Sequence, residues 1–202
     1  MIKNCKISVI LPVYNMCQTI EKTLNSIVEQ NYSNLELIVI DGGSNDGTLE
    51  YLKTKKKYID ILISEPDNGQ YDAINKGMKL ATGDIVSWLN ADDSYFPWTF
   101  EMVSKFFKMN DEINWIIGLP SYLDSSGKLS HIKYKLSAKP QSFISNGFFK
   151  HDLFGYLQQE SMFFRRKMWQ QSQGLNLKYE LAADYELWIR FARFNRLVSV
   201  NL

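Results

Sequence analysis

Short apolar runs rich in Val and Ile alternate along the chain with stretches in which apolar residues recur every three to four positions. The runs predict buried β-strands, and the spaced stretches predict amphipathic helices. The strand runs are residues 6–12, 35–41, 59–64, 84–90 and 115–119. This alternation is typical of βαβ units, so the sequence predicts an α/β fold with a mostly parallel central sheet flanked by helices.

Three predicted helices lie between these strands, each with one apolar face. The apolar positions are Ile20, Leu24, Ile27 and Val28 in the first, Ile74, Met78 and Ala81 in the second, and Phe96, Phe100, Val103 and Phe107 in the third. Residues 82–84 end the second helix, and Pro97 is expected near the first turn of the third.

The alternation stops after Leu119. Residues 120–155 show no clear period, which indicates a long excursion over the sheet, or alternatively a meander of strands that includes 128–136. A strand-like piece returns at 158–166, followed by a predicted helix at 181–194. Its inward residues are expected to be Leu187, Phe191 and Phe194, with Arg190 and Arg193 towards its end.

The composition fits one domain, residues 1–202, with a smaller C-terminal lobe from residue 120. The 202 residues are 45% hydrophobic, and 23 basic residues against 22 acidic ones give a net charge of +1. Such a balance does not favour nucleic acid or an anionic membrane. The basic run at 53–57 reads as a solvated helix end, with phosphate binding as the alternative.

Two cysteines, Cys5 and Cys17, are too few for a disulfide framework and indicate reduced thiols in the cytoplasm. No apolar run has the length needed to cross a bilayer, so we expect at most peripheral membrane contact.

Asp92 and Asp93 directly follow the apolar run 85–89, and Asp41 ends the run 37–40 in the same way. The carboxyl ends of parallel strands meet at one edge of a sheet, where ligands bind. Carboxylates placed there can hold Mg²⁺ or Mn²⁺ against the phosphates of a ligand. The alternative for Asp92 and Asp93 is a solvated turn that caps the following helix.

Other polar loops follow the remaining strands. Tyr14 can stack on a nucleobase or can be a half-buried loop aromatic. Asp41 can accept a hydrogen bond from a base, while Ser44 or Asp46 caps the next helix. The spacing at 41–48 fits neither a dinucleotide fingerprint nor a Walker loop.

One helix follows the loop at 65–70, and it carries two candidate residues. Asp72 in its first turn is either functional or a favourable charge at a helix N-terminus. Lys76 can reach a phosphate or neighbouring carboxylates.

Four segments together carry a family resemblance: Pro-Val-Tyr-Asn at 12–15, Asp-Gly-Gly-Ser-Asn-Asp-Gly-Thr at 41–48, Tyr-Asp-Ala-Ile-Asn-Lys-Gly at 71–77 and Asn-Ala-Asp-Asp at 90–93. In this order and spacing the chain resembles family 2 glycosyltransferases of the GT-A fold, especially bacterial members that build O-antigen and other surface polysaccharides. Segments 159–166 and 183–188 extend the resemblance over nearly the whole chain.

The resemblance implies a role for each matching position. Asp184 corresponds to the catalytic base, Gln159 and Glu160 to the acceptor site, and Asp92 and Asp93 to the second half of the Asp-x-Asp element, which binds ribose and metal. The positions implied in donor binding are Pro12, Tyr14, Asn15, Asp41, Ser44, Asp72, Lys76, Asn90 and Asp92, with Pro12, Tyr14 and Asp41 at the nucleobase. We therefore expect Asp41, Asp93 and Asp184 to share one cleft.

The implied function is metal-dependent, inverting transfer of a sugar from a nucleotide-sugar donor, with UDP as the first choice, to a hydroxyl of a glycan or lipid-linked acceptor. Residence in the cytoplasm near the inner face of the membrane, and a homo-oligomer as an option, go with that expectation.

Two features depart from the family pattern. Asn90 stands where many relatives have the first acid of Asp-x-Asp, and an amide oxygen binds a cation less strongly than a carboxylate. The chain also ends soon after the helix that carries Asp184, so we expect a truncated C-terminus.

Two other functions remain open. A sugar-1-phosphate nucleotidyltransferase would carry a glycine-rich basic loop after the first strand, where this chain has Tyr14-Asn15. A non-catalytic nucleotide- or glycan-binding domain would keep the pocket without the base.

Overall fold

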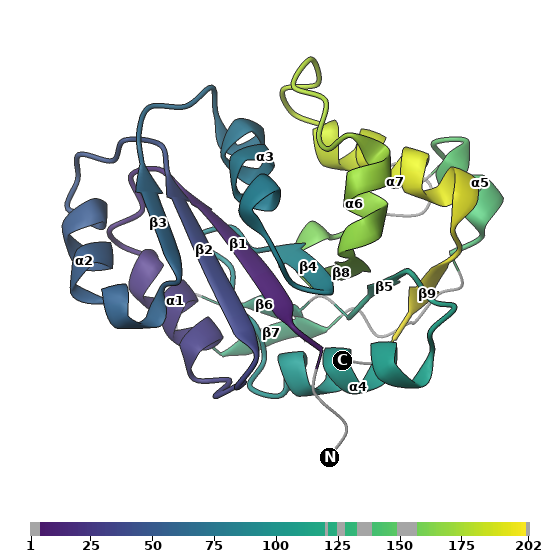
Figure 1. Ribbon diagram of the computed structural model, residues 1–202, viewed down its shortest axis with the longest axis horizontal. Coiled ribbons are helices and arrows are strands. Elements are labelled where there is room, and N and C mark those ends of the chain that lie inside the picture. The colour runs from purple at the N-terminus through teal and green to yellow at the C-terminus, as the bar shows by residue number, and fades with distance from the viewer. Residues whose placement is uncertain (1–4, 120, 125–127, 133–138, 149–156, 201–202) are drawn as a thin grey trace.

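The computed structural model describes residues 5–119, 121–124, 128–132, 139–148 and 157–200 (Figure 1). The strands are β1 Ile7–Val13, β2 Leu35–Asp41, β3 Ile61–Ser64, β4 Ile85–Trp88, β5 Trp115–Ile117, β6 Ser121–Leu123, β7 Leu129–Ile132, β8 Met162–Arg165 and β9 Leu197–Ser199. The α-helices are α1 Ile20–Val28, α2 Thr48–Thr54, α3 Gln70–Leu80, α4 Thr99–Met109, α5 Gln141–Ser145, α6 Arg166–Ser172 and α7 Ala183–Phe194, and the 3₁₀ turns are η1 Lys56–Tyr58 and η2 Gln159–Ser161.

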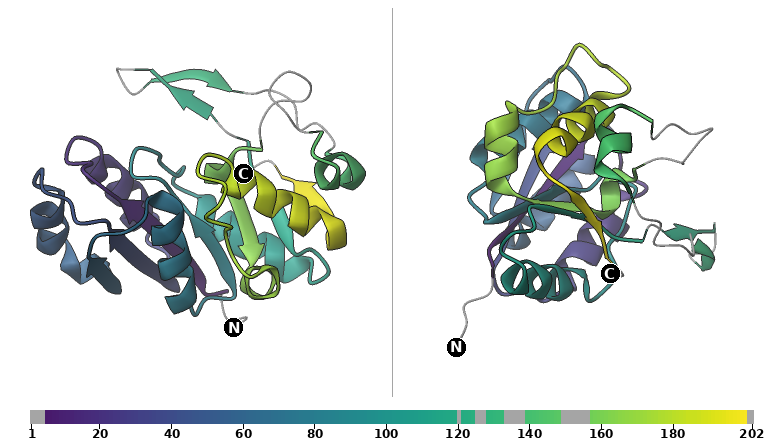
Figure 2. Two further views of the ribbon diagram at one scale, coloured as in Figure 1. Left: turned by 90° about the horizontal axis from the view of Figure 1, so that it is seen from above. Right: turned by 90° about the vertical axis from the view of Figure 1, so that its right-hand side faces the viewer.

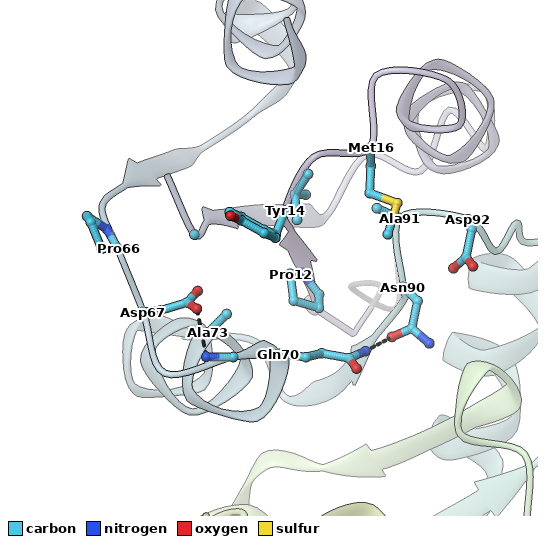
Figure 3. A pocket seen from close by; sticks show the side chains of 13 residues that line it. Pro12, Tyr14, Met16, Pro66, Asp67, Gln70, Ala73, Asn90, Ala91 and Asp92 are labelled. Atoms are coloured by element: carbon cyan, nitrogen blue, oxygen red, sulfur yellow. Dashed lines mark hydrogen bonds between the residues drawn. The ribbon is translucent and has the colours of Figure 1, made fainter. Parts of the chain in front are cut away.

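The central sheet has seven strands in the order β3-β2-β1-β4-β8-β5-β9. All neighbouring pairs are parallel except those of β8, which runs antiparallel to β4 and β5. This confirms the mostly parallel α/β sheet expected from the alternating pattern. The chain runs outward from β1 to β2 and β3 and then returns to the other side of β1 as β4, which creates a crevice at the carboxyl ends of β1 and β4 (Figure 3).

Alternate residues of each strand face opposite layers of helices (Figures 1 and 2). Val9 and Leu11 of β1 pack in the cluster that contains residues of α1 and α4. Ile10 lies in the cluster that contains Ile74 of α3 and Trp188 of α7. The sheet is therefore buried on both sides, which accounts for its nearly continuous apolar strands.

The third predicted helix begins near Pro97, as expected. α4 starts at Thr99, two residues after this proline. Phe96 is outside the helix and stacks on Trp98, with ring centroids 5.4 Å apart. The apolar spacing therefore placed the helix correctly but not its first residue.

The prediction that Phe194 faces inward is wrong, because 85% of its surface is exposed. Leu187 and Phe191 are buried as expected, and Trp188 and Ala192 complete the buried face of α7. A helix turns about 100° per residue, which puts Phe194 roughly 65° from the centre of that face, and Phe194 is the last residue of the helix.

The segment after β5 forms a separate two-stranded sheet, β6 and β7, followed by α5. The strand alternative for this region is thus correct for 121–123 and 129–132, while 120, 125–127, 133–138 and 149–156 lie outside the described residues. The basic run behaves as a solvated helix end, since Lys53, Lys56 and Lys57 are exposed where α2 passes into η1.

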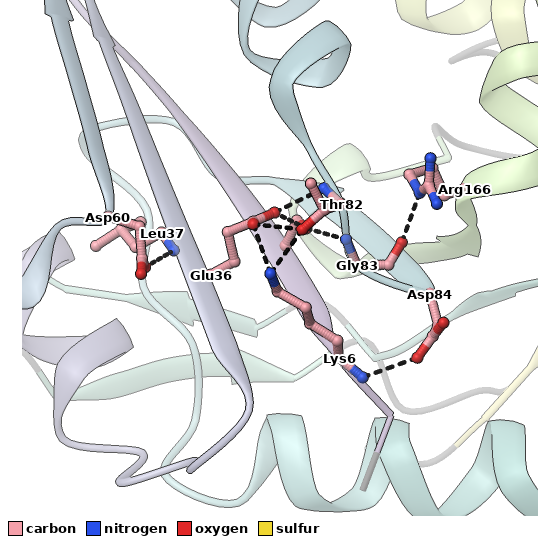
Figure 4. A network of polar contacts seen from close by, with 9 residues as sticks. Lys6, Glu36, Leu37, Asp60, Thr82, Gly83, Asp84 and Arg166 are labelled. Carbon is pink, nitrogen blue, oxygen red and sulfur yellow. Dashed lines mark hydrogen bonds and ion pairs between the residues drawn. The ribbon is translucent and has the colours of Figure 1, made fainter.

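A buried carboxylate ties together the amino end of the sheet (Figure 4). Glu36 of β2 is only 7% exposed and accepts hydrogen bonds from Lys6 Nζ at 2.7 Å, Ser8 Oγ at 2.5 Å and Thr82 Oγ1 at 2.6 Å. Burial alone would raise the pKa of Glu36, but these donors and the Thr82 backbone N–H outweigh it and hold the pKa at about 2. A Cβ on Gly83 would lie 2.5 Å from Ser8 Oγ, so only glycine fits this turn.

We predict that Glu36→Gln destabilises the protein by about 2–3 kcal/mol at pH 7, because the amide loses the charge and presents its NH₂ group to surrounding donors. The folded pKa of about 2 lies below the ordinary 4.5, so ionised Glu36 stabilises the fold above pH 4.5 and the contribution is lost as the pH falls through 2.

Denaturant unfolding at pH 7 and pH 3 measures this effect, and the deficit of the variant should be smaller at pH 3. Glu29→Gln, at an exposed position after α1, is the matched control and should change stability by less than about 0.5 kcal/mol. Equal stabilities of the two variants at pH 7 would contradict the proposed network.

Candidate active site

A cavity of about 680 Å³ opens at the crevice between β1 and β4 (Figure 3). The residues that line it are Pro12, Val13, Tyr14, Met16, Gly42, Pro66, Asp67, Gly69, Gln70, Ala73, Asn90, Ala91 and Asp92. They come from the end of β1, from the loops after β1, β2, β3 and β4, and from the first turn of α3. A volume in this range suits a small-molecule ligand or cofactor.

The loops after β1 and β2 hold one another in place. Asn15 adopts a left-handed conformation with φ of 52°, and its Oδ1 accepts the Asn45 backbone N–H at 2.9 Å. Its own N–H donates to Ser44 Oγ at 2.8 Å. Neither Asn15 nor Ser44 lines the cavity. Tyr14, which directly follows β1, does line it and is 58% exposed. The loops therefore present the Tyr14 ring to the cavity.

Asp41 is fully buried and does not line the cavity. Its carboxylate accepts hydrogen bonds from the Ser44 hydroxyl and from Ser64 Oγ, the latter at 2.5 Å. Asp41 thus fixes the ends of β2 and β3. The N-cap of α2 is Gly47, without a side-chain cap, and Asp46 before it accepts the backbone N–H of Thr48, the first residue of the helix, at 3.0 Å.

Asp67 and Gly42 are among the lining residues that had no role assigned from the sequence, although both lie in segments of distinctive sequence. Asp67 Oδ1 accepts the Gly69 N–H at 2.8 Å at the start of α3. A Cβ on Gly42 would lie 2.8 Å from Asp67 Oδ2, so the glycine lets this carboxylate approach the loop after β2. The Asp41-Gly42-Gly43 sequence was the available signal for this close approach.

Asp72 and Lys76 do not line the cavity. Asp72 accepts the Asn68 backbone N–H at 3.1 Å, and this bond lowers the pKa of Asp72, as does the nearby Lys76. Lys76 Nζ lies 3.0 Å from a Glu65 oxygen and 3.6 Å from Asp72. Both side chains thus stabilise the start of α3, and their contact with a donor stays a prediction.

The Asn90–Asp93 turn separates two cavities. Asn90 and Asp92 line the first, and Asp92 and Asp93 line a second of about 400 Å³. Gln70 Nε2 donates to Asn90 Oδ1, which connects this turn to α3 (Figure 3). Burial and the charge of Asp92 raise the pKa of Asp93 to about 6.

The second cavity brings one predicted acceptor residue beside these carboxylates, since Glu160 also lines it. Gln159 is not among its lining residues, and both amide atoms of Gln159 are buried without a hydrogen-bond partner in the described part of the chain. The acceptor role of either residue stays a prediction.

The chemistry of Asp92 and Asp93 fits a hard divalent cation. Two adjacent carboxylates, one partly buried and with a raised pKa, repel each other, and a cation between them would offset that repulsion. No group of three or more acidic, His or Cys side chains that could hold a metal occurs among the residues described. Further ligands would therefore come from a bound diphosphate and water.

Asp184 lies in the first turn of α7, as expected. Its Oδ1 accepts a hydrogen bond from the Tyr71 hydroxyl of α3 at 3.0 Å. Neither of the two cavities is lined by Asp41 or Asp184, so the single cleft expected for Asp41, Asp93 and Asp184 is not formed there. Asp41 is engaged in its own loop, and Asp184 is connected to the first cavity through α3.

The sequence model of the family described as "Glycosyl transferase family 2" matches residues 8–171 of the chain. Glycosyltransferase AglE of Haloferax volcanii is 40% identical over 93 residues, which are 44% of this chain and 31% of that protein. An uncharacterized glycosyltransferase of Haemophilus influenzae is 27% identical over 98% of this chain and 64% of its own length. A PGL/p-HBAD biosynthesis glycosyltransferase of Mycobacterium tuberculosis is 28% identical over 91% of this chain and 68% of its own length. The chain thus spans about a third to two thirds of these relatives.

Solved structures confirm the GT-A fold. Residues 1–349 of Staphylococcus aureus TarS in complex with UDP-GlcNAc give a TM-score of 0.76 at 18% identity, covering 97% of this chain and 56% of that one. The mannosyltransferase PcManGT from Pyrobaculum calidifontis in complex with GDP-Man and Mn²⁺ gives 0.70 at 21% identity, covering 99% and 56%.

We predict that Asp93→Asn raises the stability of the metal-free protein above pH 6. The folded pKa of about 6 exceeds the ordinary 3.8, so ionisation of Asp93 costs stability as the pH rises through this interval, and the amide removes that cost. After allowance for solvent screening, the gain should be about 1–2 kcal/mol, or a few degrees in Tm.

Thermal unfolding in the presence of EDTA at pH 4 and pH 8 measures this gain. At pH 4 we expect Asp93→Asn and the wild type to be similarly stable. Asp111→Asn, whose side chain is 94% exposed, is the control. A variant that behaves like this control at both pH values would refute the buried-charge explanation.

Proposed function

The chain belongs to glycosyl transferase family 2, and from this membership we propose that it transfers a sugar from a nucleotide-sugar donor to a hydroxyl of a glycan or lipid-linked acceptor. The observation that carries the proposal is the cavity between β1 and β4, with an exposed aromatic ring at one side and Asn90 and Asp92 of the turn after β4 at the other. An aromatic face suits a nucleobase, and Asp92, with Asp93 beside it on the second cavity, suits a cation that binds a diphosphate.

The donor lies in the 680 Å³ cavity with its base on Tyr14 and Pro12 and its diphosphate towards the turn after β4. The start of α3 supports this orientation, because Gly69 and Gln70 line the cavity and helix N-termini favour phosphate groups. UDP is the proposed nucleotide, and UDP-GlcNAc in TarS is a precedent. Asp41, Ser44 and Asn15 contribute by fixing the loops that hold the base, and Asp72 and Lys76 by fixing the start of α3.

Asp92 and Asp93 are the proposed ligands of Mg²⁺ or Mn²⁺, and PcManGT with Mn²⁺ is a precedent in this fold. When bound, the cation neutralises charge that develops on the leaving diphosphate. Asn90 is an orienting residue rather than a ligand, because its Oδ1 already accepts the Gln70 amide. The departure from Asp-x-Asp therefore leaves two carboxylates for the cation.

Asp184 is the proposed general base. The acceptor hydroxyl gives its proton to this carboxylate while its oxygen bonds to the anomeric carbon, and the bond from that carbon to the diphosphate breaks. A single displacement of this kind inverts the anomeric configuration. Gln159 and Glu160 are the proposed contacts to the acceptor, and Glu160 lines the cavity on the far side of Asp92 from the donor.

The proposed setting is bacterial surface polysaccharide synthesis, such as O-antigen, in the cytoplasm or at the inner face of the membrane. No helix among the described residues combines the length and apolarity needed to span a bilayer. A nucleotidyltransferase is disfavoured, because the loop after β1 carries Tyr14-Asn15 instead of a glycine-rich basic loop.

We predict that one nucleotide sugar in a panel of UDP-, GDP-, dTDP-, ADP- and CMP-sugars raises the Tm, and does so more strongly with Mn²⁺ than with EDTA. A ligand that binds only the folded state stabilises it by mass action, so the shift should grow with ligand concentration. Asp93→Asn should lose the Mn²⁺-dependent part. A panel without any shift would contradict nucleotide-sugar binding.

We predict that Asp184→Asn abolishes transfer, while the affinity for the selected nucleotide sugar stays within a few-fold of wild type. The amide cannot take the proton of the acceptor, but the donor cavity does not include residue 184. Rates and calorimetric donor affinity are measured on the same preparation. Transfer at a near wild-type rate would exclude Asp184 as the base.

A further inference from the structure

The Tyr71 hydroxyl and Asp184 Oδ1 form a hydrogen bond of 3.0 Å between residues 113 positions apart. Tyr71 is the second residue of α3 and Asp184 the second residue of α7, so the bond joins the first turns of two helices. Within the described ranges, Asp184 Oδ2 makes no hydrogen bond, which leaves this oxygen to accept a proton.

On the basis of the proposed function, we infer that Tyr71 is a positioning residue that holds the carboxylate of Asp184 in a fixed position relative to the donor. Its hydroxyl fixes Oδ1 and leaves Oδ2 to receive the proton of the acceptor. Tyr71 acts through Asp184 and is not itself required to touch substrate.

The tyrosine is suited to this role, because its ring is held and its hydroxyl stays protonated. The ring is partly buried and packs against the core cluster that contains Trp188 of α7. Burial first, and the Asp184 charge second, raise the pKa of Tyr71 to about 12. Hydrogen bonds from the backbone N–H groups at the start of α7 act in the opposite direction and are outweighed. The hydroxyl is therefore a hydrogen-bond donor throughout the physiological pH range.

The first turn of α3 also contacts the donor side. Gln70, the residue before Tyr71, lines the 680 Å³ cavity and donates to Asn90 Oδ1 in the turn that carries Asp92. Two successive side chains of one helix thus connect to the donor turn and to the candidate base. A displacement of the base relative to the anomeric carbon by about 1 Å can cost two orders of magnitude in rate.

A second contact keeps α3 fixed relative to the segment before α7. Asn75 Nδ2 donates to the Leu175 carbonyl at 2.9 Å, and Asn75 Oδ1 accepts the Leu175 N–H at 2.9 Å. This reciprocal pair lies one helical turn beyond Tyr71. The Tyr71 bond is therefore formed between elements that are already held together, so removing its hydroxyl should alter the base more than the fold.

The experiment compares Tyr71→Phe, Asp184→Asn, Asp184→Ala and the double variant Tyr71→Phe/Asp184→Ala with Tyr51→Phe as the matched control. The Tyr51 hydroxyl is buried without a hydrogen-bond partner in the described residues, so its removal should leave the rate unchanged and should not lower stability. The readout is release of nucleoside diphosphate from the nucleotide sugar selected by the Tm panel.

Tyr71→Phe should lower kcat by about tenfold or more, with the donor KM within twofold, since the donor cavity remains intact. In Tm, the losses caused by Tyr71→Phe and Asp184→Ala should be non-additive by about 3 °C, because the first removes the donor and the second the acceptor of the same bond. A kcat within twofold of wild type, or a matching loss of donor affinity, would overturn the positioning role, as would fully additive Tm changes.

Failure of this inference is distinct from failure of the proposed function. Asp184→Asn with full activity would reject the base itself, and the positioning role with it. An inactive Asp184→Asn beside a fully active Tyr71→Phe would leave the base in place and reject only Tyr71.

Discussion

The position of β1 between β2 and β4 is the constraint on which the site depends. Because both pairings are parallel, the chain must leave β1 towards β2 and later return to its other side, and the loops after β1 and β4 diverge. That divergence forms the cavity in which Tyr14 and Asp92 face a common space. Residues far apart in the sequence meet there because strand order, rather than local sequence, brings them together.

The two ends of this sheet use carboxylates in opposite ways. Glu36, at the amino end, is surrounded by donors from Lys6, Ser8 and Thr82, and its charge stabilises the fold. Asp93, at the carboxyl end, is partly buried beside Asp92, and its charge is disfavoured in the protein alone. A buried charge without compensation is costly, so its retention at the ligand-binding edge fits a group that is completed by a bound cation.

The sequence was sufficient for features that follow from local pattern. Apolar runs located all five predicted strands, and the rule that ligands bind at strand ends placed Asp92 beside a cavity. It was insufficient where a partner lies far along the chain. Nothing near Asp41 shows that Ser64 will occupy its carboxylate, and helical periodicity cannot tell that Phe194 falls outside the buried face of α7.

The same difference between local pattern and distant partners explains why the sequence did not reveal which residues of α3 make long-range contacts. Asp72 and Lys76 were the evident candidates, yet they pair with local groups at the start of the helix. The long-range contacts come from the less conspicuous Gln70 and Tyr71, which reach the turn after β4 and the start of α7. Since these two contacts come from consecutive residues of one helix, α3 links the turn after β4 to Asp184 without the loops around the cavity.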